Sequence, residues 1–172
     1  MIDLNEKRQD IIAVATELFE KFVNMPKDVR PDDKERTGIQ VLVWEPGTRN
    51  LVMVSVKEPS EAARFFAVEK AVRSETLNGA SSGDSPDFDK MKFPGSISIL
   101  LNDVPGSSDF MKIVASTSGL KPDEDVAVSA AVIAQIIEEP FVKVCDNVHL
   151  NEGRLPGWYF STNESYFQFL FE

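Results

Sequence analysis

The chain has 172 residues, of which 42% are hydrophobic and 27% charged, a composition that suits a soluble globular domain and argues against a disordered chain. Its 28 acidic side chains outnumber 18 basic ones and give a formal net charge of -10, so most of the surface would repel a phosphate backbone and we expect no nucleic-acid partner. No apolar run approaches the ~20 residues of a membrane span, and the start MIDLNEKRQD is too polar for a signal peptide, so we expect a cytoplasmic protein without a membrane partner.

The first half of the chain predicts a helix, a hairpin and a second helix. Apolar residues recur at helical spacing over residues 5–23, and Met25-Pro26 ends the pattern because Pro disfavours a helical residue before it. The apolar runs IQVLVW and LVMVSV flank EPGTRN, whose Pro-Gly and Asn predict a turn between two strands. The second helix is expected over residues 60–77 with Ser60 as its N-cap. Its expected buried side consists of Ala62, Phe65, Phe66, Val68 and Val72.

The second half predicts a long loop, another hairpin and a third helix. LNGASSGDSPDFDKMKFPG is rich in Gly, Ser, Asp and Pro, which is typical of a loop. SISILLN and MKIVAST predict two strands around DVPGSSD, and apolar spacing predicts a helix over residues 122–138. The order α-β-β-α-β-β-α favours an α+β domain, a central antiparallel sheet flanked by helices.

The remaining residues, 140–172, form an aromatic C-terminal extension to the domain at 1–139. They hold both Tyr residues, one of the two Trp and five of the twelve Phe, and their segments FVKV and YFQFLF have strand-like composition. We expect the extension to pack against the domain or a neighbouring subunit, because a disordered tail is usually poor in aromatic residues.

Common catalytic signatures are absent from the sequence, which contains no P-loop, dinucleotide-binding fingerprint, paired-cysteine zinc motif or G-x-S-x-G elbow. His149 is the only histidine, which leaves little for a histidine-based metal cluster or a Ser-His-Asp triad. Cys145 lies four residues earlier, but two ligands do not close a structural zinc site. We therefore expect a buried thiol, a surface histidine, no metal and no catalytic residue.

The stretch STSGLKPDED, between the strand MKIVA and the third helix, has a structural and a functional interpretation. Pro122 suits the first helical position, and three acids follow at the positive end of the helix dipole. Ser116, Thr117 and Ser118 carry hydroxyls that can bond exposed backbone groups. The same loop could instead hold an anion at the helix N-terminus.

Several short motifs resemble the GlcG/HbpS-like family of haem-degrading domains. They are Glu69-Lys70-Ala71 in the second helix, Phe93-Pro94-Gly95 before the third strand, Ser118-Gly119-Leu120 at the strand-to-helix turn, and Glu124 and Asp125 after it. The resemblance covers about residues 5–138. It implies a profilin-like fold and closed oligomers, in a family of which some members bind haem and others are thought to bind small molecules or to associate with chaperones.

The chain departs from that family pattern at two points. A single Gly95 stands where a double glycine is usual, and the only histidine, His149, lies outside the matching region. Axial haem ligation therefore has no obvious histidine donor, and we expect no haem cofactor although the resemblance allows one.

We expect a non-enzymatic, profilin-like homo-oligomer that binds a small molecule or a protein partner. The expected ligand-binding residues are Lys70, Ser116, Thr117, Ser118, Gly119 and Asp125. Lys70 would offer a cation to a small anionic ligand, or alternatively pair with Asp125 or Glu69. Two rival interpretations are a haem-binding or haem-degrading enzyme and an adaptor module that binds a chaperone or another protein through its C-terminal segment.

Overall fold

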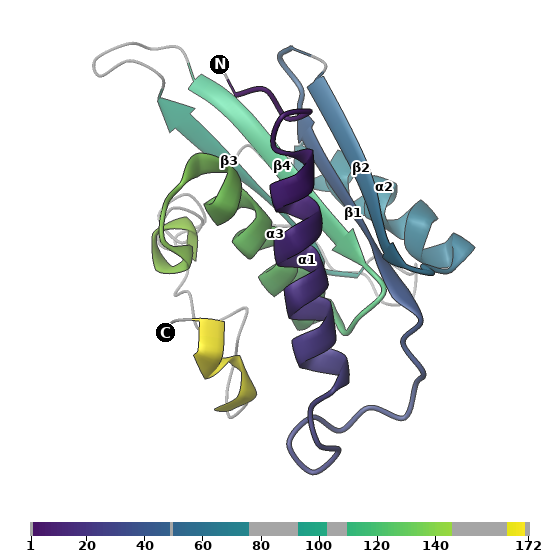
Figure 1. The fold of residues 1–172 in the computed structure, drawn as a ribbon. Helices are drawn as coiled ribbons and strands as arrows, with labels where there is room; N and C mark the ends of the chain where they lie inside the picture. Colours follow the sequence, from purple (N-terminus) through teal and green to yellow (C-terminus); the bar gives the residue numbers. More distant parts are fainter. Residues whose placement is uncertain (1, 49, 76–92, 103–109, 146–164, 171–172) are drawn as a thin grey trace.

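An antiparallel sheet covered by helices on both faces forms the domain in this computed structural model (Figure 1), which describes residues 2–48, 50–75, 93–102, 110–145 and 165–170. The helices are α1 (Arg8–Val23), α2 (Glu61–Glu75) and α3 (Pro122–Ile137); the strands are β1 (Gly38–Glu45), β2 (Asn50–Lys57), β3 (Ser96–Asn102) and β4 (Phe110–Ser118); a 3-10 helix, η4 (Ser165–Leu170), follows. These elements confirm the predicted order, and the fold is α+β and profilin-like.

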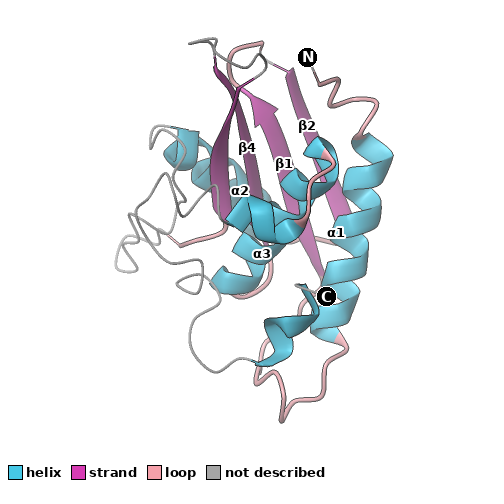
Figure 2. Cartoon of the chain, turned by 90° about the vertical axis from the view of Figure 1, so that its left-hand side faces the viewer, coloured by secondary structure: helices cyan, strands magenta, loops and turns pink. Residues whose placement is uncertain are grey.

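The four strands of this sheet are arranged in the order β2-β1-β4-β3, and every neighbouring pair is antiparallel. Each hairpin contributes one central strand, and the two central strands pair with Gln40 opposite Ser118 and Trp44 opposite Val114. The start of β1 therefore lies beside the end of β4. Figure 2 shows α1 and α2 on opposite sides of this sheet.

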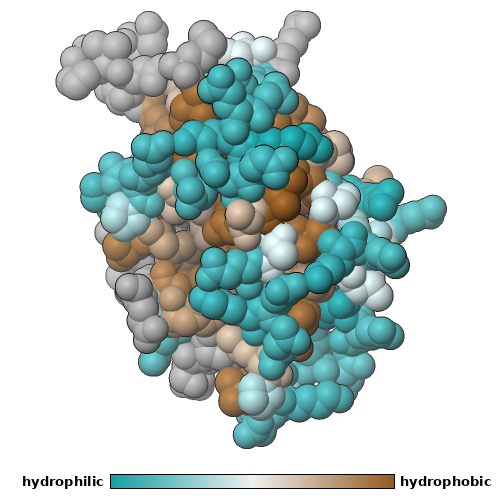
Figure 3. Space-filling model, viewed as in Figure 1, coloured by the Kyte–Doolittle hydropathy of each residue, from teal (hydrophilic) through white to brown (hydrophobic). Residues whose placement is uncertain are grey.

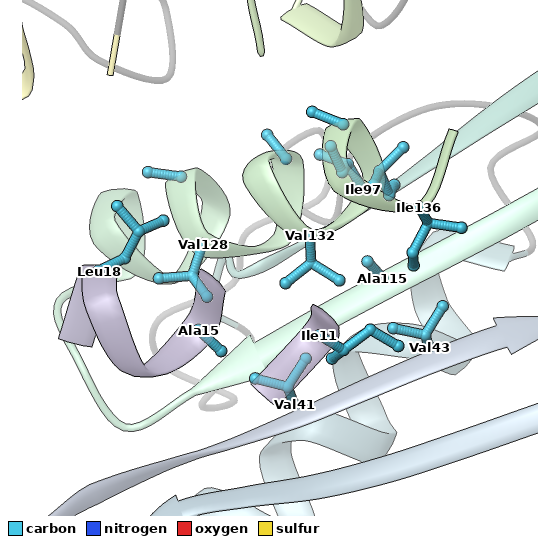
Figure 4. Close-up of a cluster of buried hydrophobic side chains, with 14 of the residues drawn as sticks. Ile11, Ala15, Leu18, Val41, Val43, Ile97, Ala115, Val128, Val132 and Ile136 are labelled. Carbon is cyan, nitrogen blue, oxygen red and sulfur yellow. The ribbon is translucent and has the colours of Figure 1, made fainter. Parts of the chain in front are cut away.

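One face of the sheet carries the main apolar core, together with α1 and α3. Side chains alternate along a strand, so the odd-numbered residues of β1 point to this face, and every one of Ile39, Val41 and Val43 is fully buried. Figure 4 shows where the helices meet the strands, with side chains from Ile11, Ala15, Leu18, Val41, Val43, Ile97, Ala115, Val128, Val132 and Ile136. Each such buried Val or Ile stabilises the fold by about 1.5–3 kcal/mol.

The opposite face packs against α2 through serine hydroxyls and through a small apolar cluster of Leu42, Val114 and Ala71, with the half-buried Trp44 beside it. Three serine hydroxyls of the strands donate to backbone carbonyl oxygens of that helix: Ser116 to Ala67 at 2.6 Å, Ser96 to Lys70 at 2.7 Å and Ser98 to Ser74 at 3.1 Å. The buried residues of α2 are Ala63, Ala67, Lys70, Ala71 and Ser74. The mostly small side chains on this side of α2 and the serines of β3 and β4 let the helix lie close enough to the sheet for these bonds to form.

The predicted buried side of α2 is wrong. Phe65, Val68 and Val72 are 66%, 41% and 52% exposed, Ala62 is exposed too, and only Phe66 is half-buried. The reason is that serine hydroxyls of the sheet bond the backbone of α2 directly, so the side of the helix that faces the sheet carries mostly small side chains. The predicted start of the helix is confirmed, since Ser60 Oγ accepts the Ala63 amide at 3.1 Å.

The C-terminal extension contains helical turns where strands were predicted. Residues 141–145 are helical and η4 replaces the strand expected from YFQFLF. The aromatic rings decide this, because Phe167 is buried edge-on against Phe22 at 5.7 Å and Phe169 lies 5.6 Å from the same ring. Residues 146–164, with His149, lie outside the described residues, as does most of the predicted long loop. Packing of the whole extension stays a prediction.

Hydrophilic residues cover much of the face of the molecule on which α1 lies (Figure 3). Within the described ranges, no helix is both long enough and apolar enough to cross a membrane. Cys145 is buried, as expected for a structural thiol.

Candidate functional site

The predicted site residues come together where β1 begins and β4 ends. Ser116, Thr117 and Ser118 close β4, Gly119 follows them in the turn, and α3 begins three residues later. Lys70 reaches this place from α2, and Asp125 reaches it from the first turn of α3. The packing of α2 against the end of β4, where α3 begins, thus assembles residues that are up to 55 positions apart in sequence.

Lys70 is 2% exposed and forms an ion pair with Asp125. Its Nζ donates to Asp125 Oδ2 at 2.9 Å and to the Thr117 carbonyl oxygen at 3.0 Å. The predicted alternative of a Lys70–Asp125 pair is therefore confirmed, whereas Glu69 pairs with Arg73 at 3.0 Å. A buried ammonium needs such acceptors because desolvation of an unpaired charge is costly.

Asp125 holds the turn as well as the lysine. Its Oδ1 accepts the Leu120 amide at 3.0 Å while its Oδ2 accepts from Lys70. Burial raises the pKa of the Asp125 carboxyl, and the nearby Lys70 charge and the two hydrogen bonds oppose that shift. This carboxylate is therefore one of the groups that fix the strand-to-helix turn.

Three of the four nearby hydroxyls are used inside the protein. Ser116 donates to the Ala67 carbonyl, Thr117 shares a hydrogen bond of 2.9 Å with Ser129, and Ser129 donates to the Gly95 carbonyl at 2.7 Å. Ser118 differs, because its hydroxyl has no hydrogen bond to any part of the chain that the structure describes. Of the predicted serine and threonine hydroxyls, that of Ser118 is the one available to a ligand.

Two glycines let the chain pass close to these groups. Gly95 has a φ of +151° and Gly119 a φ of +135°, where L side chains are disfavoured. A Cβ at Gly95 would collide with Lys70 Nζ and with the Thr117 carbonyl oxygen, and one at Gly119 would collide with the Gly38 carbonyl oxygen. Gly95 therefore leaves the space that the Lys70 ammonium occupies.

Beside this pair lies a second buried ionic network, which the sequence analysis missed. Arg30 is 5% exposed and donates through Nε and Nη2 to the two carboxylate oxygens of Glu124 at 2.5 and 2.7 Å. Its Nη2 also lies 3.0 Å from Asp32 Oδ2. The only signal in the sequence was the mixed charge of residues 26–38, which gives no partner for Arg30.

Arg36 extends this network to the turn. Its Nε donates to Asp32 at 2.8 Å, and its Nη1 donates to the carbonyl oxygens of Gly119 and Leu120. Burial alone would raise the pKa of Asp32, but hydrogen bonds from Arg36 and the Lys34 amide, with the charges of Arg36 and Arg30, lower that pKa to about 2. The loop before β1 is thus bonded to the start of α3.

A pocket of about 440 Å³ opens at this place, within the usual size range of small-molecule sites. Its wall includes Phe66 and Phe93, whose rings meet edge to face at 5.9 Å. Its lining residues are Lys34, Glu35, Arg36, Thr37, Gly38, Ser60, Ala62, Ala63, Phe66, Lys70, Phe93, Ser118, Gly119, Leu120, Pro122 and Asp125. Four of the six predicted residues line it, whereas Ser116 and Thr117 are fully buried and are not among the lining residues.

The charge of the lining differs from that of the whole chain. Lys34, Arg36 and Lys70 face Glu35 and Asp125, so cations outnumber carboxylates here although the chain as a whole carries -10. Lys34 is exposed at the mouth, while the Lys70–Asp125 pair is buried. The pocket therefore offers an anion a more favourable environment than most of the surface.

A metal ion or haem iron would need donor side chains in this lining. Among the described residues, no group of three His, Cys, Asp or Glu side chains is placed to hold a metal ion. Haem iron is usually ligated by His, Cys, Met or Tyr, and none of these types is among the residues that line the pocket. The described lining does not fit axial haem ligation.

Comparison with known proteins gives evidence for the fold alone. No protein-family model matches the chain, and no curated protein matches its sequence. A solved structure of PduOC in complex with haem is similar to it, with a TM-score of 0.52 over 76% of this chain and 92% of that chain, at 12% sequence identity. The chain therefore shares its fold with a protein whose structure was solved with haem.

Proposed function

We propose that this chain is a non-enzymatic, cytoplasmic, GlcG/HbpS-like domain that binds a small molecule in the pocket between β1, β4, α2 and α3. The observation that carries the proposal is the pocket itself, an aromatic and aliphatic wall with a buried Lys70 and a free Ser118 hydroxyl. Largely apolar pockets with a few convergent polar groups are typical of ligand sites. Homo-oligomerisation is part of the proposal, supported by the exposed apolar residues of α2 and β2.

Rigid walls support a binding role. The turn after β4 is held by Asp125 and Arg36, and α2 is bonded to the sheet by serine hydroxyls. A preformed pocket loses little conformational entropy when a ligand enters, so more of the contact energy appears as affinity.

A neutral fluorescent probe, N-phenyl-1-naphthylamine, tests this function. We expect its emission to rise and shift to the blue with saturation near one probe per chain, because the Phe66–Phe93 wall is apolar. Ala62 is exposed and lines the pocket, so Ala62→Trp should fill the space without disturbing the core and should abolish this binding. Fluorescence titration measures both results.

Val72→Trp is the matched control, because Val72 is exposed on the same helix and does not line the pocket. It should bind the probe as the wild type does. Equal binding by Ala62→Trp and wild type, or no saturable binding by either, would count against the pocket as the site.

Haem binding is the second candidate function, and the fold shared with the PduOC–haem complex is what favours it. The lining residues supply amines and a carboxylate but none of the usual axial ligands. A haem-degrading activity would need the cofactor to be held first, so it depends on the same result.

Haemin titration separates the two candidates. We expect no sharp Soret band that saturates at one haem per chain, because the described lining lacks an axial donor. Absorbance spectra of wild type and His149→Ala are the measurement. A saturating Soret band that is lost in His149→Ala would establish haem binding and overturn the first candidate.

A further inference from the structure

We infer that the pocket takes a planar aromatic molecule with a single carboxylate, and that the carboxylate binds between Lys70 and Ser118. This inference rests on the proposed function and names the class of ligand for the same pocket. Three observations carry it: the unused hydrogen-bond donors of Lys70 and Ser118, the aromatic wall of the pocket, and the existing ion pairs of the other charged groups.

Lys70 has hydrogen-bonding capacity left. An ammonium group carries three N–H donors, and two of them go to Asp125 Oδ2 and the Thr117 carbonyl oxygen. The third has no acceptor within the described ranges, although the side chain is 2% exposed and lines the pocket. A ligand oxygen at the inner end of the pocket would complete this set.

Ser118 provides a second donor residue in the lining of the same pocket. Lys70 bonds the carbonyl of Thr117, the residue before Ser118, so both groups belong to the same end of β4. Ser118 lines the pocket, and its hydroxyl has no partner in the described part of the chain. Two donor residues that line one pocket suit the two oxygens of a carboxylate, and hydrogen bonds to an ionised acceptor are the stronger kind.

The wall above these donors is apolar and partly aromatic. Phe66 and Phe93 meet edge to face, and Ala63, Leu120 and Pro122 add aliphatic surface. Aromatic rings pack well against such an arrangement, since offset and edge-to-face contacts are the favoured geometries. The body of the ligand should therefore be a flat ring system.

The charge of the ligand follows from the groups that are already paired. Asp125 neutralises much of the Lys70 charge, and the Arg36 guanidinium is bonded to Asp32 and to two carbonyl oxygens. Too little cationic charge remains to stabilise a dianion such as a phosphate monoester. A cationic ligand would meet Lys70 at the inner end and Lys34 at the mouth, so a monoanion fits best.

Competition between three naphthalene derivatives tests this class. We expect 2-naphthoate to displace N-phenyl-1-naphthylamine about tenfold more tightly than the neutral 2-naphthamide, and 2-naphthylmethylammonium to be the weakest. In Ser118→Ala the ratio of amide to acid dissociation constants should fall severalfold, because one carboxylate donor is lost. Ser55→Ala, on β2 outside the pocket, is the matched control and should keep the wild-type ratio.

The outcomes separate this inference from the function on which it rests. No saturable probe binding by the wild type overturns both. Probe binding with equal displacement by all three compounds, or with the ammonium compound tightest, overturns the carboxylate class and leaves the pocket. An amide-to-acid ratio in Ser118→Ala equal to that of the wild type overturns the placement of the carboxylate.

Discussion

Replacing Lys70 by Met should lower the free energy of unfolding by about 3–5 kcal/mol. The substitution keeps an unbranched side chain but leaves the Asp125 carboxylate, 3% exposed, without its cation, and the Thr117 carbonyl without its donor. Breaking one partner of a buried ion pair costs more than the pair contributes, because the remaining charge stays desolvated. Urea unfolding followed by circular dichroism measures the change.

The effect of this substitution should depend on pH. Burial already raises the pKa of Asp125, and loss of the lysine should raise it further. When the pKa of an acid is raised by folding, the folded state binds more protons than the unfolded state. The free energy of unfolding therefore falls as the pH rises above the unfolded-state pKa of about 3.9. The loss of stability in Lys70→Met should therefore be larger at pH 8 than at pH 5.

Lys34→Met, at an exposed lysine, is the control for Lys70→Met. Equal losses of stability from the two variants would contradict the role of the buried ion pair.

Replacing Arg30 by Met should also cost about 3–5 kcal/mol. Glu124 is fully buried and receives two hydrogen bonds from this guanidinium, so its carboxylate would lose its main partner. The loop before β1 should loosen at the same time, because Asp32 loses one of its two arginines. Denaturation measures the stability, and hydrogen exchange of residues 30–37 measures the loop.

Arg30→Lys is the informative control, because an ammonium keeps the charge and loses the planar fork that matches both carboxylate oxygens. It should fall between wild type and Arg30→Met. Lys7→Met removes an exposed ion pair with Glu138 and should change stability far less, because solvent screens such pairs. If Arg30→Met were as mild as Lys7→Met, the Arg30–Glu124 pair would not contribute to stability.

The sheet and its helices could be predicted because their signals are local. Each strand is an apolar run next to turn residues, and α3 begins at the Pro122 that its sequence indicates. The Lys70–Asp125 pair is one of the alternatives that the sequence offers for Lys70, because the family resemblance assigns both residues to the same site. The Arg30–Glu124 pair was missed because 94 residues separate its members and a single sequence contains no sign of their contact.

Hydrophobic spacing failed in α2 and in the C-terminal extension for one physical reason. Periodicity shows which residues share a face, but the surface opposite decides whether that face is buried. The sheet presents serines to α2 and therefore buries Ala67 and Ala71 while Phe65 stays exposed. In η4, Phe167 and Phe169 pack edge to face against the Phe22 ring, and this packing outweighs the strand-like composition of the segment.

The serine hydroxyls that bond α2 to the sheet give the two faces of the sheet different tolerance to sequence change. On the α1 and α3 side the contacts are non-directional, so a helix can shift slightly to absorb a change in side-chain volume. On the α2 side, Ser116, Ser96 and Ser98 bond helix carbonyls at defined angles and so fix both the rotation and the height of the helix. Substitutions at Phe66 or Ala62 can therefore reshape the pocket while Lys70 keeps its position, which makes α2 a suitable element on which to select new ligand specificities.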